Sequence, residues 1–389
     1  MMVVPGQWLG VLGGGQLGRM FCQAAQSMGY RVMVLDPEEQ NPTAALADAH
    51  VLADYDDEES LAELARNCLA VTTEFENVPA VSLQRLAQQT HVSPSARAVE
   101  LVQDRCVEKA FIQAQGVLVA PYVAVHSLAD LQNAPADLFP GILKVARLGY
   151  DGKGQYRVAT REEALAAFAS MGEVNCVLEA RLDLKAELSV VLARDVDGNS
   201  QVFPVARNVH HDGILAVTHV DGQDSALTTE AISAATRIAE GLGYHGVMCV
   251  EFFVLKDNVL LVNEVAPRPH NSGHFTLNAC STSQFEQQAR VMAGLPLGDP
   301  RLLSPAVMLN LLGDVWLSTA DNNVVEPDWQ AVLALPGTSL HLYGKVQARR
   351  GRKMGHINIT ASDISQAVKI ANEVVSLLRL PAPATMPTL

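Results

Sequence analysis

The chain has 389 residues, enough for two or three domains with separate cores. Its formal net charge of −14 argues against a nucleic-acid-binding protein, because such proteins usually present a strongly basic domain. The six cysteines form no CxxC pair and no regular framework, so we expect neither structural zinc nor disulfides, and a reducing, cytoplasmic location. We find no apolar run long enough to span a bilayer and no signal peptide, so we expect no membrane partner.

The first elements are a strand, a glycine-rich turn, a helix and a second strand. Residues 8–12 and 30–35 are apolar and predict strands, and residues 21–28 between them predict a helix. An acid, Asp36, follows the second strand, and the turn has the GxGxxG spacing of a dinucleotide-binding fingerprint. Glycines that let the backbone approach a phosphate, next to a helix N-terminus, predict an anion site more generally. A tight turn without a ligand is the alternative; the three glycines are Gly13, Gly15 and Gly18.

Two polar side chains follow the predicted strand at residues 68–73. These are Glu76 and Asn77, and ligands of open α/β sheets lie beyond the carboxyl ends of the strands. We therefore expect both side chains to face whatever the glycine turn holds. A solvated loop is the alternative.

Two further segments place cations near possible phosphate sites. Residues 104–115 predict an amphipathic helix with Arg105 and Lys109 one turn apart on one face, which by itself indicates a solvated basic face. Residues 141–146 predict an apolar strand that contains Lys144. If that lysine is buried, it needs an anion or a lowered pKa.

A second glycine-rich loop covers residues 147–155. It combines three glycines with cations and can turn N–H groups toward a phosphate, although it lacks the ending of a Walker A loop. Its position after Lys144 favours a polyphosphate site over a merely flexible hairpin. Further along, His210 and His211 are adjacent, and side chains alternate along an extended chain, so we do not expect a zinc site there.

Two apolar strands near residues 246–266 each contain one glutamate. A two-residue turn at Asp257 and Asn258 would pair Lys256 with Val259 and set Glu251 directly opposite Glu264. Two carboxylates about 5 Å apart repel by roughly 3 kcal/mol at an effective dielectric near 20. A divalent cation bound by carboxylate oxygens would relieve that repulsion. A solvated strand face or a shared proton is the alternative.

Two polar segments are further candidates for a ligand site. Residues 267–274 follow Glu264 directly, are stiffened by proline, and contain an arginine and two histidines, so we expect them to line a site. Residues 344–356 contain five cations and no acid, which suits an anionic substrate such as a phosphate monoester, or a partner surface. The five are Lys345, Arg349, Arg350, Arg352 and Lys353.

Together these segments resemble the ATP-grasp superfamily and, within it, the N5-carboxyaminoimidazole ribonucleotide synthetases of purine biosynthesis. The resemblance runs through nearly the whole chain, and its most specific part is the run from residue 263 to residue 274. The glycine loops alone would not be specific. The matching segments are residues 15–20, 75–79, 149–155, 210–215, 263–274 and 351–356.

This resemblance implies a fold that is partly α/β and partly α+β. It implies an N-terminal Rossmann-like (pre-ATP-grasp) domain over residues 1–104 and an ATP-grasp domain over residues 105–300, with a lid at about 121–178. A small β-rich C-terminal domain would follow over residues 301–389.

The resemblance also implies ligand sites. Glu251 and Glu264 would bind the metal, with Asn271 as a helper. ATP would be bound by Arg105, Lys144, Gly149, Tyr150, Asp151, Gly152, Lys153, Gly154, Gln155, Glu179, Ala180, Arg181, Leu182, Glu187, His210, Asn263 and Glu264. Aminoimidazole ribonucleotide would be bound by Gly15, Gln16, Leu17, Glu76, Asn77, Asp151, Lys345, Arg352 and Lys353, with Arg350 adjacent.

The implied reaction uses ATP and bicarbonate, with Mg²⁺ or Mn²⁺, to carboxylate the exocyclic amine of 5-aminoimidazole ribonucleotide through carboxyphosphate. We expect Lys144, Asp151, Arg268 and His274 to take part in catalysis, with Arg268 binding bicarbonate or carboxyphosphate. The resemblance also implies a homodimer. One departure concerns the lid, because some relatives have Thr-Gly where this chain has Arg147 and Leu148.

Three other functions remain open from the sequence. A nicotinamide-dependent dehydrogenase would explain the first glycine turn and Asp36, but it leaves the second glycine loop and the paired glutamates unused. A related ATP-grasp ligase that carboxylates or formylates another amine would differ only in its acceptor pocket. A catalytically silent nucleotide-binding regulator would not need so complete a set of polar residues.

Overall fold

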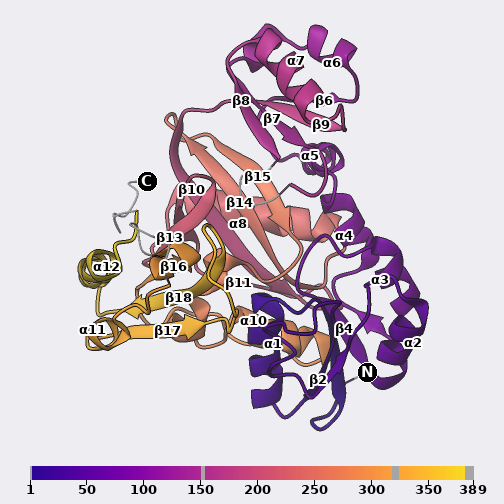
Figure 1. Ribbon diagram of the computed structural model, residues 1–389, viewed down its shortest axis with the longest axis vertical. Coiled ribbons are helices and arrows are strands. Elements are labelled where there is room, and N and C mark those ends of the chain that lie inside the picture. The colour runs from indigo at the N-terminus through magenta and orange to yellow at the C-terminus, as the bar shows by residue number, and fades with distance from the viewer. Residues whose placement is uncertain (1, 150–153, 318–323, 382–389) are drawn as a thin grey trace.

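The computed structural model describes residues 2–149, 154–317 and 324–381 (Figure 1). Within these residues the chain forms a parallel five-stranded sheet, an antiparallel four-stranded sheet and an antiparallel nine-stranded sheet. They lie respectively at the bottom, at the top and through the centre of the view in Figure 1. The fold is therefore the predicted mixture of α/β and α+β parts.

The parallel sheet forms the N-terminal part of the chain. Its strands follow the spatial order β3-β2-β1-β4-β5, with helices on both faces. Side chains alternate along β1: Leu9 and Val11 pack toward α1 and α10 (Gln284–Met292), while Leu12 packs toward α2 and α3. The elements are β1 (Trp8–Leu12), α1 (Gln16–Ser27), β2 (Arg31–Leu35), β3 (Ala49–Val51), α2 (Glu58–Asn67), β4 (Ala70–Thr73), α3 (Ala80–Leu86), β5 (His91–Val92) and α4 (Ala96–Val102).

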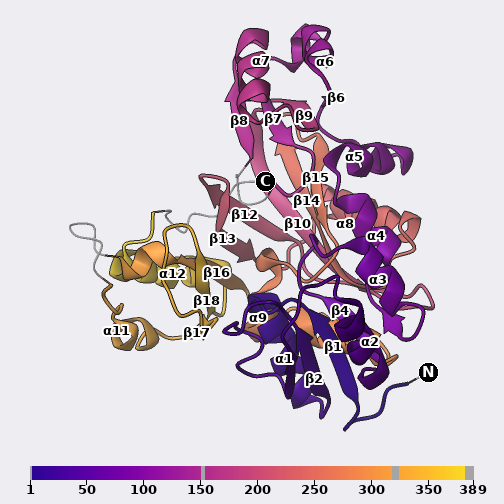
Figure 2. The ribbon, with the colours of Figure 1, turned by 45° about the vertical axis from the view of Figure 1, so that its right-hand side comes forward.

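Helix α5 (Arg105–Ala114) leads from the parallel sheet to the smaller antiparallel sheet. Asp104 begins this helix by accepting hydrogen bonds from the first-turn amides. The sheet has the order β6-β9-β7-β8 and is covered by α6 and α7, which form a lobe at the top of Figures 1 and 2. Its elements are β6 (Tyr122–Val125), α6 (Leu128–Gln132), β7 (Gly141–Val145), β8 (Gln155–Val158), α7 (Arg161–Ser170) and β9 (Cys176–Ala180).

The central sheet has the order β15-β14-β10-β12-β13-β16-β18-β17, with β11 paired to β10. Helix α8 (Ala226–Gly241) covers it with a face of small residues, including Ala231 and Ala235, which allows close packing on β10 and β14. The first strands are β10 (Leu184–Arg194), β11 (Ser200–Val202), β12 (Ala206–His211), β13 (Ile214–Val220), β14 (Gly246–Leu255) and β15 (Leu260–Ala266).

The C-terminal part continues the central sheet. Strand β16 pairs with β13, for example at Leu309 and Val217. The strands on either side of the predicted domain boundary near residue 300 are therefore hydrogen-bonded to each other. In Figure 2 this part lies beside the parallel sheet and below the lobe. Its elements are β16 (Ala306–Leu312), α11 (Trp329–Leu333), β17 (Thr338–Leu342), β18 (Lys353–Thr360) and α12 (Ile364–Leu378), and the helices α9 (Thr276–Ala279) and α10 (Gln284–Met292) precede it.

Two details concern expectations from the sequence. Helix α1 begins at Gln16, five residues before the predicted start, because a carboxylate from elsewhere in the chain satisfies its first amides. Among the helices of the described ranges, none is long and apolar enough to cross a membrane.

Candidate active site

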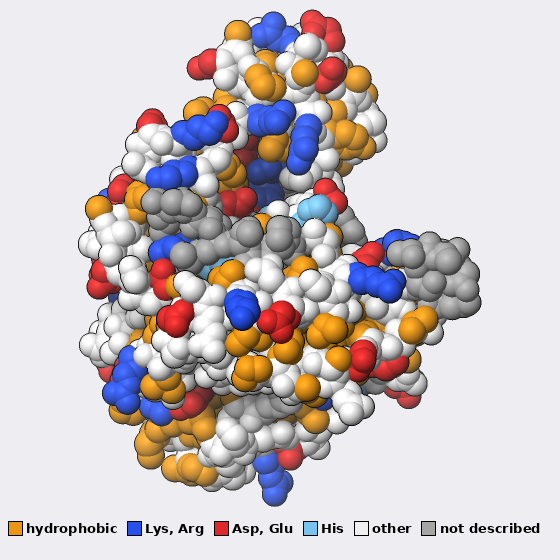
Figure 3. All heavy atoms as spheres, turned by 90° about the vertical axis from the view of Figure 1, so that its left-hand side faces the viewer, with side chains coloured by type: hydrophobic (Ala, Val, Ile, Leu, Met, Phe, Trp, Pro, Cys, Tyr) orange, Lys and Arg blue, Asp and Glu red, His pale blue; other side chains and the backbone are white. Residues whose placement is uncertain are grey.

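A cavity of about 780 Å³ lies where the three parts of the chain meet. Figure 3 shows a hollow below the upper lobe, with Lys and Arg side chains gathered on its walls. Most of the predicted site residues line this cavity although they come from opposite ends of the chain. They are Gln16, Leu17, Glu76, Asn77, Arg105, Lys144, Gly149, Gly154, Gln155, Glu187, His210, Glu251, Asn263, Glu264, Arg268, Asn271, His274, Lys345, Arg352 and Lys353.

The hairpin of β14 and β15 brings the two glutamates together as predicted. Glu251 pairs with Glu264 across the strands, and both line the cavity. The predicted turn was wrong, however, because Leu255 bonds to Val259 around a three-residue loop that ends with Asn258 at a φ of +66°. A bulge at Asn263 then restores the register. The bulge also places Asn263 and Glu264, two consecutive residues, on the cavity.

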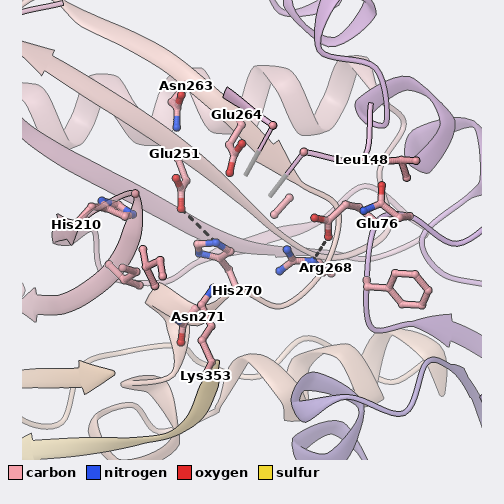
Figure 4. A pocket seen from close by; sticks show the side chains of 18 of the residues that line it. Glu76, Leu148, His210, Glu251, Asn263, Glu264, Arg268, His270, Asn271 and Lys353 are labelled. Carbon is pink, nitrogen blue, oxygen red and sulfur yellow. Dashed lines mark hydrogen bonds and ion pairs between the residues drawn. The ribbon is translucent and has the colours of Figure 1, made fainter. Parts of the chain in front are cut away.

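The carboxylates of the paired glutamates repel each other. Burial, and then the neighbouring Glu264, raise the pKa of Glu251 to about 7. Each carboxylate has a different partner: His270 Nε2 lies 3.2 Å from Glu251 Oε1, and Arg105 bonds Glu264 Oε2 at 3.1 Å (Figure 4 shows Glu251 with His270).

Asn271 completes a set of oxygen donors beside these acids. Its side chain lines the cavity, and both its amide oxygen and its amide nitrogen are buried without a hydrogen-bond partner in the described structure. No cluster of three His, Cys, Asp or Glu side chains suited to a metal occurs in the described residues. Two carboxylates and an amide nevertheless fit Mg²⁺, which keeps several waters and takes other oxygens from substrate phosphates.

Helix α5 is not the solvated basic face that its sequence indicated. Lys109 is only 1% exposed and lies 3.2 Å from Glu179 Oε1, while Arg105 reaches across to Glu264. Between them Glu108 accepts a 2.6 Å hydrogen bond from the Val265 amide at the edge of β15. One short helix thus contacts both the glutamate hairpin and the lobe.

Lys144 is partly buried, with 12% of its side chain exposed, and it has a carboxylate partner. Its Nζ lies 2.9 Å from Glu179 Oε2, so Glu179 binds two lysines at once. Burial opposes the charge on Glu179, but Lys144 and Lys109 together lower its pKa to about 2. Two lysines on one carboxylate leave an excess positive charge next to the cavity, suited to a further anion.

The predicted hinge lies behind this cluster. The carboxylate of Glu179 is used by the lysines, and the amides of Ala180 and Arg181 donate to Pro121 O and Pro140 O, at 2.9 Å each. Glu179, Ala180, Arg181 and Leu182 are not among the described residues that line the cavity.

Glu187 and His210 form a pair on the cavity wall. His210 Nδ1 bonds Glu187 Oε2, whereas His211 is half exposed beside Asp212, so the two histidines point to different places. Burial disfavours the His210 imidazolium, but Glu187 raises the His210 pKa to about 9.

The second glycine loop borders the cavity at Gly149, Gly154 and Gln155. The expectations for Tyr150, Asp151, Gly152 and Lys153 lie outside the described residues. Leu148 has a φ of +64°, a conformation that suits glycine and costs another residue roughly 1 kcal/mol or more.

The first glycine turn already holds an anion, namely the side chain of Glu74. Its carboxylate accepts from the amides of Gly15, Leu17 and Gly18 at 2.7, 3.0 and 3.0 Å. A Cβ on Gly15 would lie 2.2 Å from the Glu74 oxygen, which explains the glycine. Gly15 does not line the cavity, in contrast to Gln16 and Leu17.

The side chain of Asp36 is also hydrogen-bonded to this turn. It accepts from the Gly14 amide and from the Tyr55 hydroxyl, each at 2.6 Å, and it is buried. The dehydrogenase hypothesis needs free turn amides and a free Asp36 for a dinucleotide, and both are occupied here.

Glu76 and Arg268 meet across the cavity. Arg268 Nε bonds Glu76 Oε2, as Figure 4 shows, although the two residues are 192 positions apart. Burial opposes both charges, yet the pair lowers the pKa of Glu76 and raises that of Arg268. His274 lies deeper, with Nδ1 3.1 Å from Gln284 Nε2 and its ring on His356, and burial lowers its pKa well below 6.5.

The C-terminal cations border the same cavity. All five are among its lining residues, including Lys353, which Figure 4 shows below Asn271. Lys345 Nζ donates to Lys353 O at 2.8 Å, and Arg352 donates to Gln347 O at 2.9 Å.

Sequence reasoning missed several residues of the site. Glu74 and Glu108 line the cavity, and Lys109 supports it from behind, whereas His270 lies on the cavity as the polar segment 267–274 predicted. The acids at residues 74 and 108 gave no local signal, because their partners are distant in sequence.

Family models match three consecutive parts of the chain. A ribonucleotide synthetase preATP-grasp domain matches residues 7–103, and an ATP-grasp domain matches residues 110–285. A phosphoribosylaminoimidazole carboxylase C-terminal domain matches residues 306–369.

Curated relatives and solved structures agree with these matches. An N5-carboxyaminoimidazole ribonucleotide synthase of Brucella melitensis is 46% identical over 91% of this chain and 96% of its own length, and that of Bacillus subtilis is 40% identical over 92% of each. The Staphylococcus aureus synthetase complexed with ADP superposes with a TM-score of 0.88 at 36% identity, covering 97% of this chain and 98% of that one. The Aspergillus clavatus synthase with ADP and 5-aminoimidazole ribonucleotide gives 0.86 at 28% identity, covering 96% and 98%.

Proposed function

The chain belongs to the N5-carboxyaminoimidazole ribonucleotide synthases, ATP-grasp ligases of purine biosynthesis, and we propose that it uses bicarbonate and a divalent cation in this reaction. The observation that carries the cation proposal is the pairing of Glu251 with Glu264 beside the side-chain amide of Asn271, which has no hydrogen-bond partner among the described residues. These three residues would hold Mg²⁺, or Mn²⁺ in its place. The bound ion would neutralise charge on the phosphoryl oxygens during transfer.

The proposed reaction has three steps. A bicarbonate oxygen attacks the γ-phosphorus of ATP, the bond to the β-phosphate oxygen breaks, and carboxyphosphate and ADP form. Carboxyphosphate then separates into carbon dioxide and phosphate. The exocyclic amine of aminoimidazole ribonucleotide attacks carbon dioxide, and the released phosphate accepts the amine proton.

The nucleotide end of the cavity is proposed to lie against α5 and the lobe. Arg105 and Lys144, held by Glu264 and Glu179 respectively, are positioned to contact phosphate oxygens without reorganising. Glu187, paired with His210, would contact the ribose, and Asn263 would contact the phosphates. The hinge residues 179–182 and the loop residues 149–155 would enclose the adenine and the phosphates, and Asp151 would help to position the acceptor.

The acceptor end is proposed to lie between the parallel sheet and the C-terminal cations. Gln16, Leu17, Glu76 and Asn77 line one side, and the other side is supplied by Lys345, Arg352 and Lys353. These cations suit the phosphate monoester of aminoimidazole ribonucleotide. Gly15 would contribute only through the shape of its turn, since its amide is bonded to Glu74.

Bicarbonate and carboxyphosphate are proposed to bind between these two ends. Arg268 lies there, held by Glu76 and close to the glutamate hairpin (Figure 4). Closure of the loop at residues 149–155 would exclude water, which would otherwise hydrolyse carboxyphosphate. His274, neutral and packed at the cavity floor, would act on the reaction through the shape of the site. A homodimer in the cytoplasm is proposed from the family alone.

The test is phosphate release from ATP with Mg²⁺ and bicarbonate, measured with and without aminoimidazole ribonucleotide. We expect release to be stimulated by that nucleotide and radiolabelled bicarbonate to appear in an acid-labile product. Stimulation by another amine instead would identify a related ligase. Equal release with and without any acceptor would contradict the proposal.

A further inference from the structure

His270 connects the paired glutamates to a buried polar network. Its Nε2 lies 3.2 Å from Glu251 Oε1, and its Nδ1 lies 2.9 Å from Ser272 Oγ. The ring lines the cavity beside Asn271, as Figure 4 shows. The reaction proposed above assigns no role to this side chain.

The direction of these hydrogen bonds follows from one fixed donor. The backbone amide of Ser272 lies 3.3 Å from His270 Nδ1, and a backbone N–H can only donate. Nδ1 must therefore be the acceptor, so the ring proton of the neutral imidazole is on Nε2, facing the Glu251 carboxylate.

The network behind Ser272 agrees with this direction. Thr218 Oγ1 donates to Asn208 Oδ1 at 2.9 Å, Asn208 Nδ2 donates to Ser189 Oγ at 2.9 Å, and Ser189 donates to Ser272 Oγ at 2.7 Å. All four side chains are buried. Because Ser272 Oγ receives this donor, its own proton is left for His270 Nδ1. The network runs from β13 through β12 to β10, where Ser189 is directly across from Glu251.

We propose that His270 is a positioning residue of the cation site, orienting Glu251 through Nε2–H while the Thr218–Asn208–Ser189–Ser272 network fixes its tautomer. A carboxylate held through one oxygen still offers the other to a cation. His270 also begins the short turn Asn271–Gly273, so the same residue places the amide of Asn271. Hydrogen-bonded groups behind metal ligands commonly set their orientation in this way.

The inference rests on the proposed cation site, so its test measures binding without turnover. Mn²⁺ is titrated into the full-length protein with saturating ADP, and free Mn²⁺ is followed by electron paramagnetic resonance. We expect His270→Leu to raise the Mn²⁺ dissociation constant about 10- to 100-fold. His270→Gln, which keeps a donor toward Glu251, should recover part of that loss, and Ser272→Ala should give a smaller loss. The control is His245→Gln, whose imidazole bonds Val92 O away from the cavity.

The possible outcomes separate the two proposals. No Mn²⁺ binding by the unaltered protein would overturn the cation site itself. Unchanged Mn²⁺ affinity in a folded His270→Leu variant, or in Ser272→Ala if the former does not fold, would overturn only the role of His270. Nitrogen-15 spectra of the labelled histidines should give the Nε2–H tautomer for His270, and an Nδ1–H signal would contradict the inferred network.

Discussion

Each principal cation of the cavity already has a carboxylate partner. Arg105 is held by Glu264, Lys144 by Glu179 and Arg268 by Glu76. Such pairs fix long side chains in the geometry that a polyanionic substrate requires, which lowers the ordering cost of binding. A triphosphate and a bicarbonate can then compete with the carboxylates for cations that are already in place.

Substituting Glu264 by glutamine tests the cation site at a single residue. We expect Glu264→Gln to abolish cation-dependent phosphate release, because a neutral amide is a much weaker ligand for a hard divalent ion. The fold should persist, since the amide oxygen can still accept from Arg105. Steady-state phosphate release and circular dichroism provide the two measurements.

The matched control lies on the same hairpin. Asp257→Asn removes an exposed acid at the turn, outside the cavity, and leaves an oxygen that can accept from the Val259 amide. It should retain full activity. Normal activity in Glu264→Gln would remove the metal assignment.

His210 predicts a pH-dependent contribution to stability. Glu187 raises the His210 pKa from 6.5 to about 9 in the folded chain, against the effect of burial. The resulting stabilisation is fully present below the unfolded pKa of 6.5 and is lost as the pH rises through about 9. His210→Gln should therefore reduce the free energy of unfolding by at most about 3 kcal/mol at pH 6 and by little at pH 10.

Urea-induced unfolding of the nucleotide-free protein at the two pH values measures this difference. The neighbouring His211→Gln is the control, because its half-exposed ring should contribute little at either pH. An equal effect of His210→Gln at pH 6 and pH 10 would show that the ion pair with Glu187 does not stabilise the fold.

At the scale of elements, the glutamate hairpin shows what local sequence can and cannot predict. The apolar strands and the position of the turn predicted that Glu251 and Glu264 lie opposite each other, and the structure confirms it. The prediction succeeded because two errors cancelled: the loop has one residue more than expected, and the bulge at Asn263 compensates. Asparagine at a positive φ is compatible with both turn lengths, so the sequence alone could not distinguish them.

Contacts between distant elements set a further limit. The glycine turn was predicted to bind an anion, but the anion is Glu74, which lies 59 residues from Gly15. Likewise, Lys109 looked solvated because its partner Glu179 belongs to the lobe. The element carrying each charge could be predicted from periodicity, whereas its partner depends on how the sheets pack.

Helix α5 provides a prediction at this scale through Glu108. Burial raises the Glu108 pKa from 4.5 to about 8, so the folded chain favours the protonated side chain. The stability that this preference contributes is fully present below pH 4.5 and is lost as the pH rises through about 8. Glu108→Gln keeps an acceptor for the Val265 amide without a titrating proton. Relative to the unaltered chain, this variant should gain stability as the pH rises from about 4.5 to about 8.

Glu108→Leu separates the hydrogen bond from the charge. It leaves the Val265 amide without an acceptor and should be about 1–3 kcal/mol less stable than Glu108→Gln at every pH. Chemical unfolding of both variants across this pH range measures the effects. A leucine variant as stable as the glutamine variant would show that the contact between α5 and β15 contributes nothing.

At the scale of the whole molecule, the cavity is lined by residues from all three parts of the chain. Glu76 comes from the segment after β4 of the parallel sheet. Glu251 and Arg268 come from β14 and from the segment after β15 of the central sheet, and Lys353 comes from the C-terminal part. A reaction that passes a short-lived intermediate from a nucleotide to an acceptor amine benefits from such an arrangement. Both substrates must bind next to each other in one volume that the protein encloses. The family models divide the chain into three, but the site requires all three parts.

The shared central sheet predicts that the C-terminal part cannot be removed cleanly. A chain ending at residue 300 would lose β16 and β18, leaving the edge of β13 and buried side chains such as Val217 open to water. It would also lose Tyr343 from the core that covers the parallel sheet. Exposed edges and apolar patches promote aggregation, so we expect this chain to be largely insoluble.

A chain ending at residue 381 is the matched control. It keeps α12 and the core that α12 completes, and removes only residues outside the described part of the structure. Soluble yield, size-exclusion elution and thermal unfolding should match those of the full-length protein. If the chain ending at residue 300 were instead soluble and unfolded cooperatively, the C-terminal part would be an independent domain whose pairing with β13 adds little stability.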